Sequence, residues 1–116
     1  MRRGEIRLVD LDPVRGSEAN KRRPAVIVSN DGANATASRL GRGVLTVVPI
    51  TSNTTRIFEF QVFLAASSTG LPRDGKAQAE RVRAVSVDRI GSAIGFVPAG
   101  AMAEVDDALR LHLALS

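Results

Sequence analysis

The 116-residue sequence has no cysteine, no tryptophan and no tyrosine, and its single histidine is His112. The absence of cysteine excludes disulfides, thiolate metal sites and a cysteine nucleophile. A histidine among leucines near the C-terminus is typical of a partly exposed packing residue, and one histidine placed so late fits no Ser, His and Asp triad. An enzyme with this composition must therefore work with arginine, hydroxyl and carboxylate side chains.

Long apolar runs and cofactor motifs are absent as well. No apolar run approaches the roughly 18 residues of a membrane span, and the N-terminal MRRGEIRLVDLDP lacks the apolar segment of a signal peptide. The GRG turn at residues 41–43 does not match a phosphate-binding loop. We therefore expect no membrane association and no cofactor, whereas a metal site built from carboxylates remains possible in principle. The missing cysteines fit a protein of the reducing cytoplasm.

The charge is positive and is carried mainly by arginine. The chain has 16 basic and 12 acidic residues, a net charge of +4, and 14 of the basic residues are arginine. Residues 101–116 carry a net charge of −2, so the rest of the chain carries +6. Guanidinium groups match the geometry of phosphate oxygens, which favours an anionic partner. On charge alone, however, a solvated and solubilising surface is slightly favoured over a binding surface.

Short apolar segments bounded by Gly, Pro, Asn and Ser predict strands within one domain, residues 1–116. Residues 25–29 and 44–50 are continuously apolar, which is typical of strands buried on both faces, and Pro49 is expected to mark an end or an edge. Residues 57–64 alternate instead, with Phe58, Phe60, Val62 and Leu64 on the predicted core face. The predicted strands span residues 5–10, 25–29, 44–50, 57–64, 77–87 and 93–97.

One later segment has a helical repeat. Met102, Val105, Leu109 and Leu113 follow one another at steps of three and four, and Asp106 and Asp107 are expected to face away from this stripe. The segment 30–43 is long enough for a helical turn. These patterns predict a small, mainly β domain, in which five or six strands curl into a barrel that a C-terminal helix closes.

The stretch GSEANKRRPAVIVSN, residues 16–30, places three cations beside a buried strand. The ring of Pro24 biases Arg23 toward an extended conformation, so Arg23 is held at the entrance of the strand. A cation fixed in this way is a preorganised site for phosphoryl chemistry. Lys21 and Arg22, on the loop side, suit general attraction to a nucleic-acid backbone or simply face water.

A second strand also ends in polar groups. In VPITSN, residues 48–53, a buried strand passes through proline into Thr51, Ser52 and Asn53. The Thr51 hydroxyl can donate to a phosphate oxygen, although a Thr-Ser-Asn sequence by itself is also ordinary turn chemistry. The pairing of the two strand ends, with Arg23 on one and Thr51 on the other, is what indicates a phosphate site.

These residues carry a resemblance to a known family. From about Arg3 to Leu113 the chain resembles the MazF/PemK family of toxin endoribonucleases from bacterial toxin–antitoxin pairs. The two most specific motifs are RRGEIRLVDLDPVRGSEANKRRPAVIVSN and VVPITSN. FEFQVFL and DGKAQAERVRAV are similar to the family's following strands, more loosely. The resemblance implies a mainly β (α+β) fold, a small SH3-like barrel of five to seven strands with a C-terminal helix.

The resemblance also implies a site and partners. It assigns catalytic roles to Arg23, Thr51 and the loop residue Glu18. It implies a homodimer that cuts single-stranded RNA (messenger, ribosomal or transfer RNA) without a metal, and a cognate antitoxin that blocks the RNA groove. Arg7 and Arg81 replace the aromatic residue and the glutamine that are usual in the family, which affects the cleavage motif. The candidate substrate-binding residues are Lys21, Arg22, Ser52, Asn53, Glu80, Arg81 and Arg83.

The chemistry expected of such a site uses the RNA's own 2′-hydroxyl as nucleophile and yields a 2′,3′-cyclic phosphate and a 5′-hydroxyl. Because three of the four phenylalanines are expected in the core, arginine planes would replace aromatic residues in stacking on bases. Two other functions remain compatible with the sequence. One is a non-catalytic toxin of the same barrel fold that grips a protein such as DNA gyrase, and the other is a basic module that binds RNA without cutting it.

Overall fold

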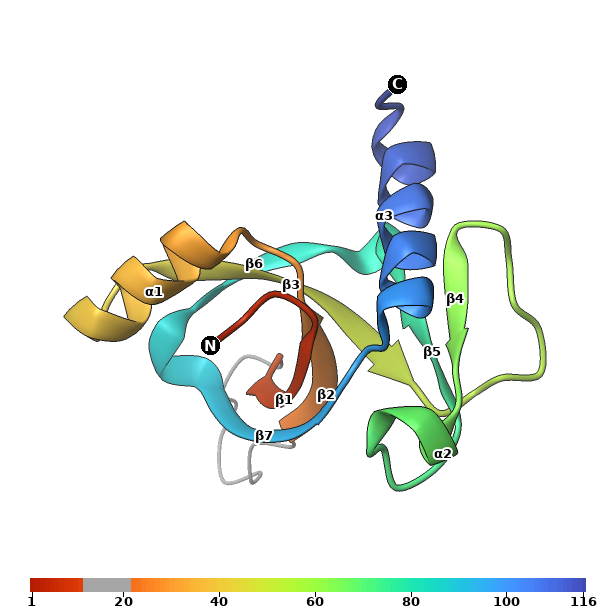
Figure 1. The fold of residues 1–116 in the computed structure, drawn as a ribbon, viewed down its shortest axis with the longest axis horizontal. Helices are drawn as coiled ribbons and strands as arrows, with labels where there is room; N and C mark the ends of the chain where they lie inside the picture. Colours follow the sequence, from red (N-terminus) through yellow and green to blue (C-terminus); the bar gives the residue numbers. More distant parts are fainter. Residues whose placement is uncertain (12–21) are drawn as a thin grey trace, which may run out of the picture.

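The computed structural model describes residues 1–11 and 22–116, and Figure 1 shows their arrangement. Seven antiparallel strands form one curled sheet in the order β4-β5-β3-β2-β1-β7, and β6 pairs with β3 beside this path. The mainly β prediction with a C-terminal helix is therefore confirmed. The elements are β1 (Glu5–Asp10), β2 (Arg22–Ile27), α1 (Asp31–Leu40), β3 (Val44–Thr51), β4 (Gln61–Leu64), α2 (Ala66–Thr69), β5 (Gly75–Gln78), η1 (Ala79–Arg81), β6 (Arg83–Ser86), η2 (Val87–Arg89), β7 (Ile90–Phe96) and α3 (Ala99–Leu113).

The central strands β2 and β3 are buried on both faces, as their continuous apolar sequences predicted. In β2, Val26 belongs to the core cluster that packs under α3, whereas Ala25 and Ile27 belong to the cluster on the other face. Val47 and Val48 of β3 divide between the same two clusters. Because neighbouring residues of a strand point to opposite faces, a continuous apolar run supplies both cores at once.

Two strand boundaries differ from the prediction in a way that affects the site. β2 begins at Arg22 rather than at Ala25, so Arg22 and Arg23 are themselves strand residues. β3 continues through Pro49 to Thr51. Residues 44–47 of β3 pair with β6 and residues 50–51 pair with β5, so Pro49 lies where one partner has ended and the other has not begun. A residue without an N–H is tolerated there because that ladder is already interrupted.

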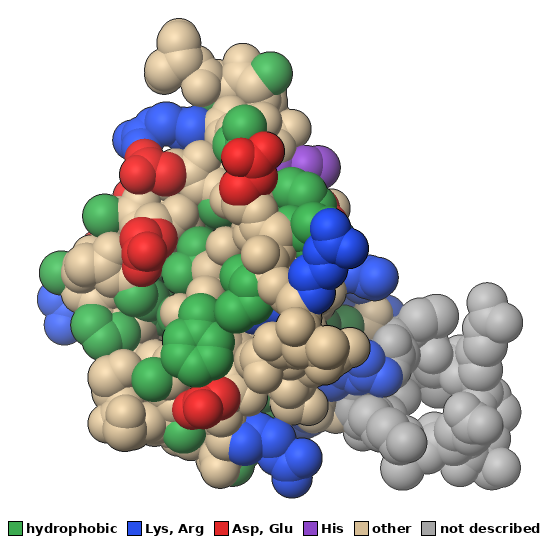
Figure 2. Space-filling model, turned by 90° about the vertical axis from the view of Figure 1, so that its right-hand side faces the viewer, with side chains coloured by type: hydrophobic (Ala, Val, Ile, Leu, Met, Phe, Trp, Pro, Cys, Tyr) green, Lys and Arg blue, Asp and Glu red, His purple; other side chains and the backbone are tan. Residues whose placement is uncertain are grey.

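The prediction for residues 57–64 was wrong in its first half. The strand β4 begins only at Gln61, and the phenylalanines expected in the core are Phe58, which is 39% exposed, Phe60, which is partly buried, and Phe63, which is 45% exposed. The rings of Phe58 and Phe60 stack with centroids 5.3 Å apart, and the Arg56 guanidinium lies 4.5 Å above the Phe58 ring. Figure 2 views this side of the molecule and shows apolar side chains gathered across its middle.

Residues 77–87 do not form one strand. They divide into the end of β5, the short helix η1, and β6. The division arises because β5 pairs with the C-terminal end of β3, whereas β6 pairs with its N-terminal half. The segment 30–43 holds a full ten-residue helix, α1, rather than a single turn. The Asn30 side chain accepts a hydrogen bond from the N–H of Ala33 at its start, and Gly41 adopts a left-handed conformation at its end.

α3 follows Pro98 as predicted, but its apolar stripe is shorter than expected. Val105 and Ala108 are buried against the sheet, whereas Leu113 is 49% exposed in the last turn. Asp106 does not face away from the molecule, because it forms an ion pair with Nη2 of Arg3 at 2.5 Å. Among the residues that the structure describes, no helix is long and apolar enough to cross a membrane.

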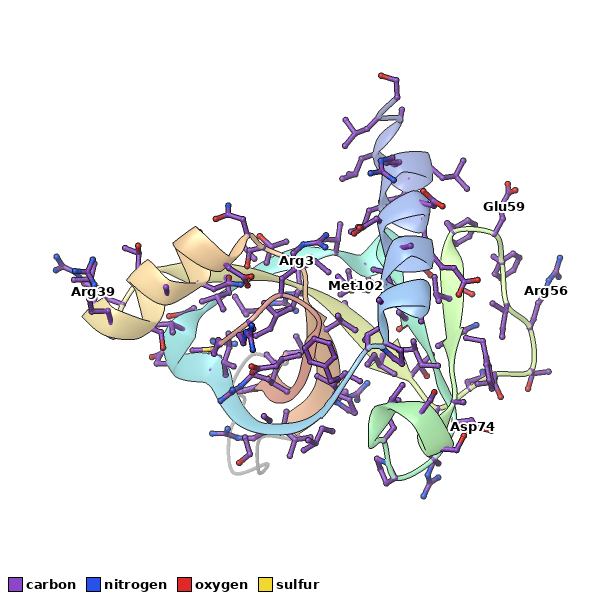
Figure 3. All side chains as sticks on the ribbon, in the orientation of Figure 1. Arg3, Arg39, Arg56, Glu59, Asp74 and Met102 are labelled. Carbon is purple, nitrogen blue, oxygen red and sulfur yellow. The ribbon has the colours of Figure 1, made fainter. Side chains whose placement is uncertain are left out.

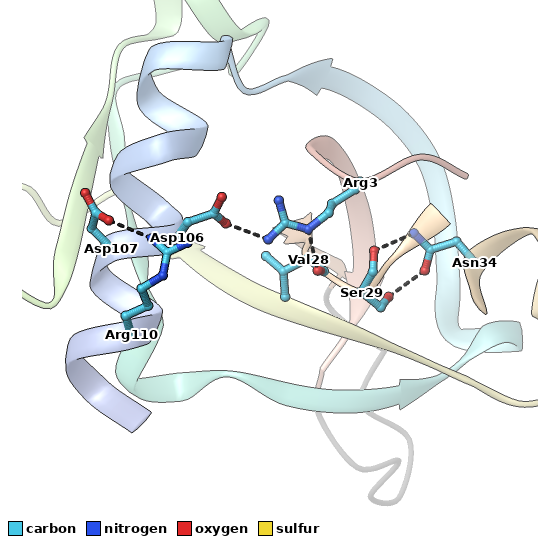
Figure 4. Close-up of polar contacts among 7 residues, drawn as sticks. All are labelled: Arg3, Val28, Ser29, Asn34, Asp106, Asp107 and Arg110. Carbon is cyan, nitrogen blue, oxygen red and sulfur yellow. Dashed lines mark hydrogen bonds and ion pairs between the residues drawn. The ribbon is translucent and has the colours of Figure 1, made fainter. Parts of the chain in front are cut away.

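A polar network joins the N-terminus, α1 and α3 at the end of β2 (Figure 4). Nε of Arg3 donates to the carbonyl oxygen of Val28 while its Nη2 reaches Asp106. The fully buried Asn34 of α1 donates to the carbonyl oxygen of Ser29 at 2.8 Å and accepts from the Ser29 hydroxyl at 2.5 Å. The Ser29 hydroxyl oxygen in turn accepts from the N–H of Thr46. This network fixes the end of β2 opposite the end that carries Arg23.

We expect Asn34→Ala to lower the free energy of unfolding by about 1–3 kcal/mol, because it removes the hydrogen-bond partner of both the hydroxyl hydrogen and the carbonyl oxygen of the partly buried Ser29. Chemical denaturation of the two proteins measures this difference. The matched control is Ser38→Ala on the exposed face of α1, which should change stability by less than about 0.5 kcal/mol. Equal stability of Asn34→Ala and the wild type would contradict the structural role of this network.

Candidate active site

The candidate site lies where β2 begins and β3 ends. The two strands are antiparallel, and Ala25 pairs with Pro49. Continuing this register by two residues along each strand brings Arg23 opposite Thr51. Side chains directly opposite each other in antiparallel strands lie on the same face and are close neighbours. The structure therefore brings together the two residues that the sequence singled out from distant segments.

Arg23 and Thr51 line two adjoining hollows in the surface. The first has a volume of about 330 Å³ and is lined by Arg23, Pro24, Ile50, Thr51, Ser52, Leu71, Pro72, Arg73 and Gly75. The second has a volume of about 440 Å³ and is lined by Leu11, Arg23, Pro49, Ile50, Thr51, Gln78, Arg81 and Arg83. Since both hollows share Arg23, Ile50 and Thr51, this shared wall divides one larger depression into two parts.

The Thr51 hydroxyl is held by its neighbours in the turn. Its oxygen accepts a hydrogen bond from the N–H of Asn53 at 3.2 Å, and the Asn53 side chain accepts from the N–H of Thr55. A hydroxyl group carries one donor hydrogen besides its acceptor lone pairs. The bond from Asn53 fixes the oxygen while leaving that hydrogen to donate to a ligand in either hollow.

The second hollow is rich in nitrogen donors. Arg81 and Arg83, both candidate substrate-binding residues, line it together with Gln78. Nη1 of Arg83 donates to the carbonyl oxygen of Leu11 at 2.8 Å, so this arginine also holds the end of β1 beside the hollow. Gln78 was missed by the sequence reasoning, because only the pairing of β5 with the end of β3 reveals it.

Three other predicted residues, Arg22, Asn53 and Glu80, line neither hollow. Arg22 lies against β7, where a Cβ on Gly91 would overlap its guanidinium. The Asn53 side chain closes the turn after β3 instead of lining a hollow, although Ser52 lines the first one. Glu80 turns toward β4 and accepts a hydrogen bond from Nε2 of Gln61 at 2.7 Å. Glu18 and Lys21 lie outside the described residues.

Arg73 was also missed, since nothing in the sequence links it to Arg23. It lies between α2 and β5 in the segment 70–75, which is braced at several points. Gly70 adopts φ of +89°, a conformation that side chains rarely adopt, and a Cβ on Gly95 of β7 would overlap the carbonyl oxygen of Thr69. At the other end, the Asp74 carboxylate accepts from the N–H of Ala66 at 2.8 Å. Close backbone packing of α2 on β7 therefore positions one wall of the first hollow.

Among the described residues, no acidic side chain lines either hollow. Among residues 1–11 and 22–116, no three His, Asp or Glu side chains lie close enough together to hold a metal ion. The polar side chains that line the two hollows carry guanidinium, amide and hydroxyl groups. Such an arrangement attracts an anion and can donate several hydrogen bonds to it.

Comparisons with known proteins agree over nearly the whole chain. Residues 2–113 match the family described as PemK-like, MazF-like toxin of type II toxin–antitoxin system. Endoribonuclease MazF9 of Mycobacterium tuberculosis is 62% identical over 115 residues, covering 99% of this chain and 98% of MazF9. Endoribonuclease MazF6 of the same organism is 40% identical over 114 residues, covering 97% and 96%. A solved mycobacterial endoribonuclease in complex with its cognate antitoxin superimposes with a TM-score of 0.77 at 25% identity, covering 100% of this chain and 97% of that one.

The bracing of the 70–75 segment predicts a difference between two glycines. We expect Gly95→Ala to lower the free energy of unfolding by about 1–3 kcal/mol, because the added methyl group overlaps the Thr69 carbonyl and forces the strand and α2 apart. Gly100→Ala in α3 is the matched control, since a Cβ there meets nothing within 4 Å and alanine favours the helix. Denaturation curves that show Gly95→Ala to be as stable as Gly100→Ala, or more stable, would contradict this packing.

Proposed function

Because the chain belongs to the PemK-like, MazF-like family of toxins of type II toxin–antitoxin systems, we propose that it is an endoribonuclease toxin that cuts single-stranded RNA. Its relatives MazF9 and MazF6 are endoribonucleases, and the match to them supports a single toxin domain over residues 1–116. The observation that carries the proposal is the convergence of Arg23 and Thr51 on the same two hollows. The scissile phosphate would lie on the wall that the hollows share.

In the proposed reaction the 2′-hydroxyl of the RNA attacks the adjacent phosphorus. A pentavalent phosphorane forms with additional negative charge, and its collapse leaves a 2′,3′-cyclic phosphate and a 5′-hydroxyl. Arg23 contacts two phosphate oxygens and stabilises charge that is greatest in the transition state. Thr51 donates its hydroxyl hydrogen to another oxygen. The reaction requires no metal in this scheme, because the nucleophile comes from the substrate, and DNA is spared because it lacks that hydroxyl.

Proton transfer requires a further group. A guanidinium holds its proton too tightly to act as a good general base in water. In the proposal the Glu18 carboxylate takes the proton of the 2′-hydroxyl, which the resemblance to the family supports. In the same proposal Arg23 donates the proton to the leaving 5′-oxygen, in a site from which the bound RNA has excluded water. The Glu18 part of this assignment rests on the sequence alone.

The RNA backbone on either side of the cut would contact the remaining polar groups of the depression. Ser52 lines the first hollow, and Arg81 and Arg83 line the second. Lys21 and Arg22 would extend the positive charge beyond the hollows and attract the strand at longer range. The location of Glu80 beside Gln61 argues against a direct contact between Glu80 and the RNA.

The proposed partners are a second copy of the chain and a cognate antitoxin. A solved relative of the same fold is an endoribonuclease in complex with its cognate antitoxin, which supports an antitoxin here. An acidic segment of that antitoxin, folding as it binds, would neutralise the positive charge of the arginine-lined depression and prevent RNA from binding there. In the homodimer, RNA would lie across the face shared by the two copies.

One experiment separates this function from the two alternatives. The purified protein is incubated with single-stranded RNA in excess chelator, and the product ends are mapped. Cyclic phosphate and 5′-hydroxyl ends at defined positions would support the nuclease. Bound but intact RNA would favour an RNA-binding module, and neither binding nor cutting would favour a protein-binding toxin, which has no need of the Arg23–Thr51 pair.

We expect Arg23→Ala to lower kcat for RNA cleavage roughly 100- to 1,000-fold, the effect of removing one donor that stabilises a transition state. Single-turnover cleavage assays on a short RNA measure this, and circular dichroism checks that the fold is retained. Arg39→Ala, which removes a charge at the far end of α1 (Figure 3), is the matched control and should cut at the wild-type rate. Wild-type cleavage by Arg23→Ala would refute the assignment.

A further inference from the structure

The two hollows beside the Arg23–Thr51 pair differ in chemistry. Beyond the residues they share, the second hollow is lined by three polar side chains, Gln78, Arg81 and Arg83, together with Leu11 and Pro49. Beyond the same shared residues, the first hollow is lined by Pro24, Leu71, Pro72 and Gly75 and by the polar side chains of Ser52 and Arg73. A phosphate group requires donors on several sides, so it suits the second hollow or the shared wall. The first hollow suits a flat, mainly apolar group.

The floor of the first hollow is rigid. Leu71 is 6% exposed and Ile50 is 7% exposed, and both belong to the core cluster under α3. A Cβ on Gly75 would lie 2.9 Å from Cγ2 of Ile50 and 2.9 Å from the carbonyl oxygen of Thr51, so glycine lets β5 lie close to β3 at this point. A ligand in this hollow would rest on core side chains that cannot move without disturbing the fold.

The rim of the hollow is held as firmly as its floor. Thr69 accepts a hydrogen bond at its hydroxyl oxygen from the N–H of Leu71 at 3.2 Å and donates to the carbonyl oxygen of Ala65 at 2.7 Å. Together with the Asp74 bond to the N–H of Ala66, these contacts fix the backbone on both sides of Pro72 and Arg73. The rim is therefore preorganised before any ligand binds.

Arg73 extends from this rim with its guanidinium uncommitted. The side chain is exposed, and within the described part of the chain it makes no hydrogen bond, ion pair or ring contact. The nearest carboxylate in sequence, Asp74, is engaged with the N–H of Ala66. A planar guanidinium in the lining of an apolar hollow can hold a nucleobase by stacking, because unpaired RNA bases stack on arginine planes as well as on aromatic rings.

We propose that the first hollow is a nucleobase slot, in which an unpaired base next to the scissile phosphate rests on Leu71, Pro72 and Ile50 while the Arg73 guanidinium stacks on its face. The slot rests on the proposed ribonuclease function and deepens it. Stacking and apolar contact do not read the donor and acceptor pattern of a base edge, so the slot tolerates different bases. Base-edge selection then belongs to the second hollow, where Gln78, Arg81 and Arg83 supply directed donors.

The test removes the base instead of exchanging it. A short single-stranded RNA with one mapped cleavage position is prepared in three forms: unmodified, with the base 5′ to the cut replaced by hydrogen, and with the base 3′ to the cut replaced by hydrogen. All three keep the 2′-hydroxyl and the phosphate. KM and kcat are measured for the wild type, Arg73→Ala, Arg73→Lys and Arg39→Ala.

For the wild type, we expect removal of one of the two bases to raise KM roughly 5- to 150-fold, the range that base stacking covers. We call this rise in KM the base-removal penalty. Arg73→Ala should bind the unmodified RNA more weakly and should lose most of this penalty, with kcat little changed. Arg73→Lys, which keeps the charge without the plane, should resemble Arg73→Ala, whereas Arg39→Ala should resemble the wild type.

The slot is overturned if neither base removal raises KM in the wild type, or if Arg73→Ala or Arg73→Lys keeps the full penalty. Its failure is distinguishable from that of the proposed function by Arg23→Ala on the same RNAs. Cleavage that depends on Arg23 but is indifferent to Arg73 would remove the slot and leave the nuclease. A wild-type protein that cuts none of the RNAs would remove both.

Discussion

The pairing of β2 with β3 is the constraint on which the candidate site depends. Both strands are buried on both faces, so a shift of one residue in their register would exchange the side chains of the two core clusters. The register that pairs Ala25 with Pro49 is therefore strongly specified, and it brings Arg23 and Thr51 together beyond the last paired residues. The hydrophobic cores thus fix the relative position of two polar side chains that make no contribution to those cores.

The interruption of β3 at Pro49 gives this arrangement its shape. Because β6 pairs with the first half of the strand and β5 with its end, the chain between them leaves the sheet as η1 and carries Arg81 and Arg83 to one side of the site. On the other side, the close approach of Gly95 to Thr69 holds α2 and the segment up to Gly75. The result is a polar hollow and a mainly apolar hollow on either side of one shared wall. That asymmetry is the physical basis for assigning different parts of an RNA to each.

The side of the molecule formed by β4 and residues 52–60 shows why composition is an incomplete guide to binding surfaces. Three of the four phenylalanines were assigned to the core because they lie in a segment of alternating hydrophobicity, but strand pairing begins only at Gln61. The Arg56–Phe58 contact and the stacked rings of Phe58 and Phe60 instead stabilise an exposed turn, which Nζ of Lys76 also holds by donating to the carbonyl oxygen of Arg56. Aromatic surface is therefore present after all, at a location distinct from the two hollows.

The sequence by itself determined the mainly β class, the doubly buried central strands, the C-terminal helix after Pro98 and, through its motifs, the family, which the comparisons confirm. It also singled out Arg23 and Thr51, because each follows or precedes a buried strand in a pattern that is local in sequence. Only the tertiary structure decided that Gln78 and Arg73 join them, that Arg22 and Glu80 turn elsewhere, and that Phe58 and Phe63 are exposed. The physical reason is that strand propensity and hydrophobic alternation are local properties, whereas the lining of a hollow depends on which strands pair, in which register, and how closely their backbones approach.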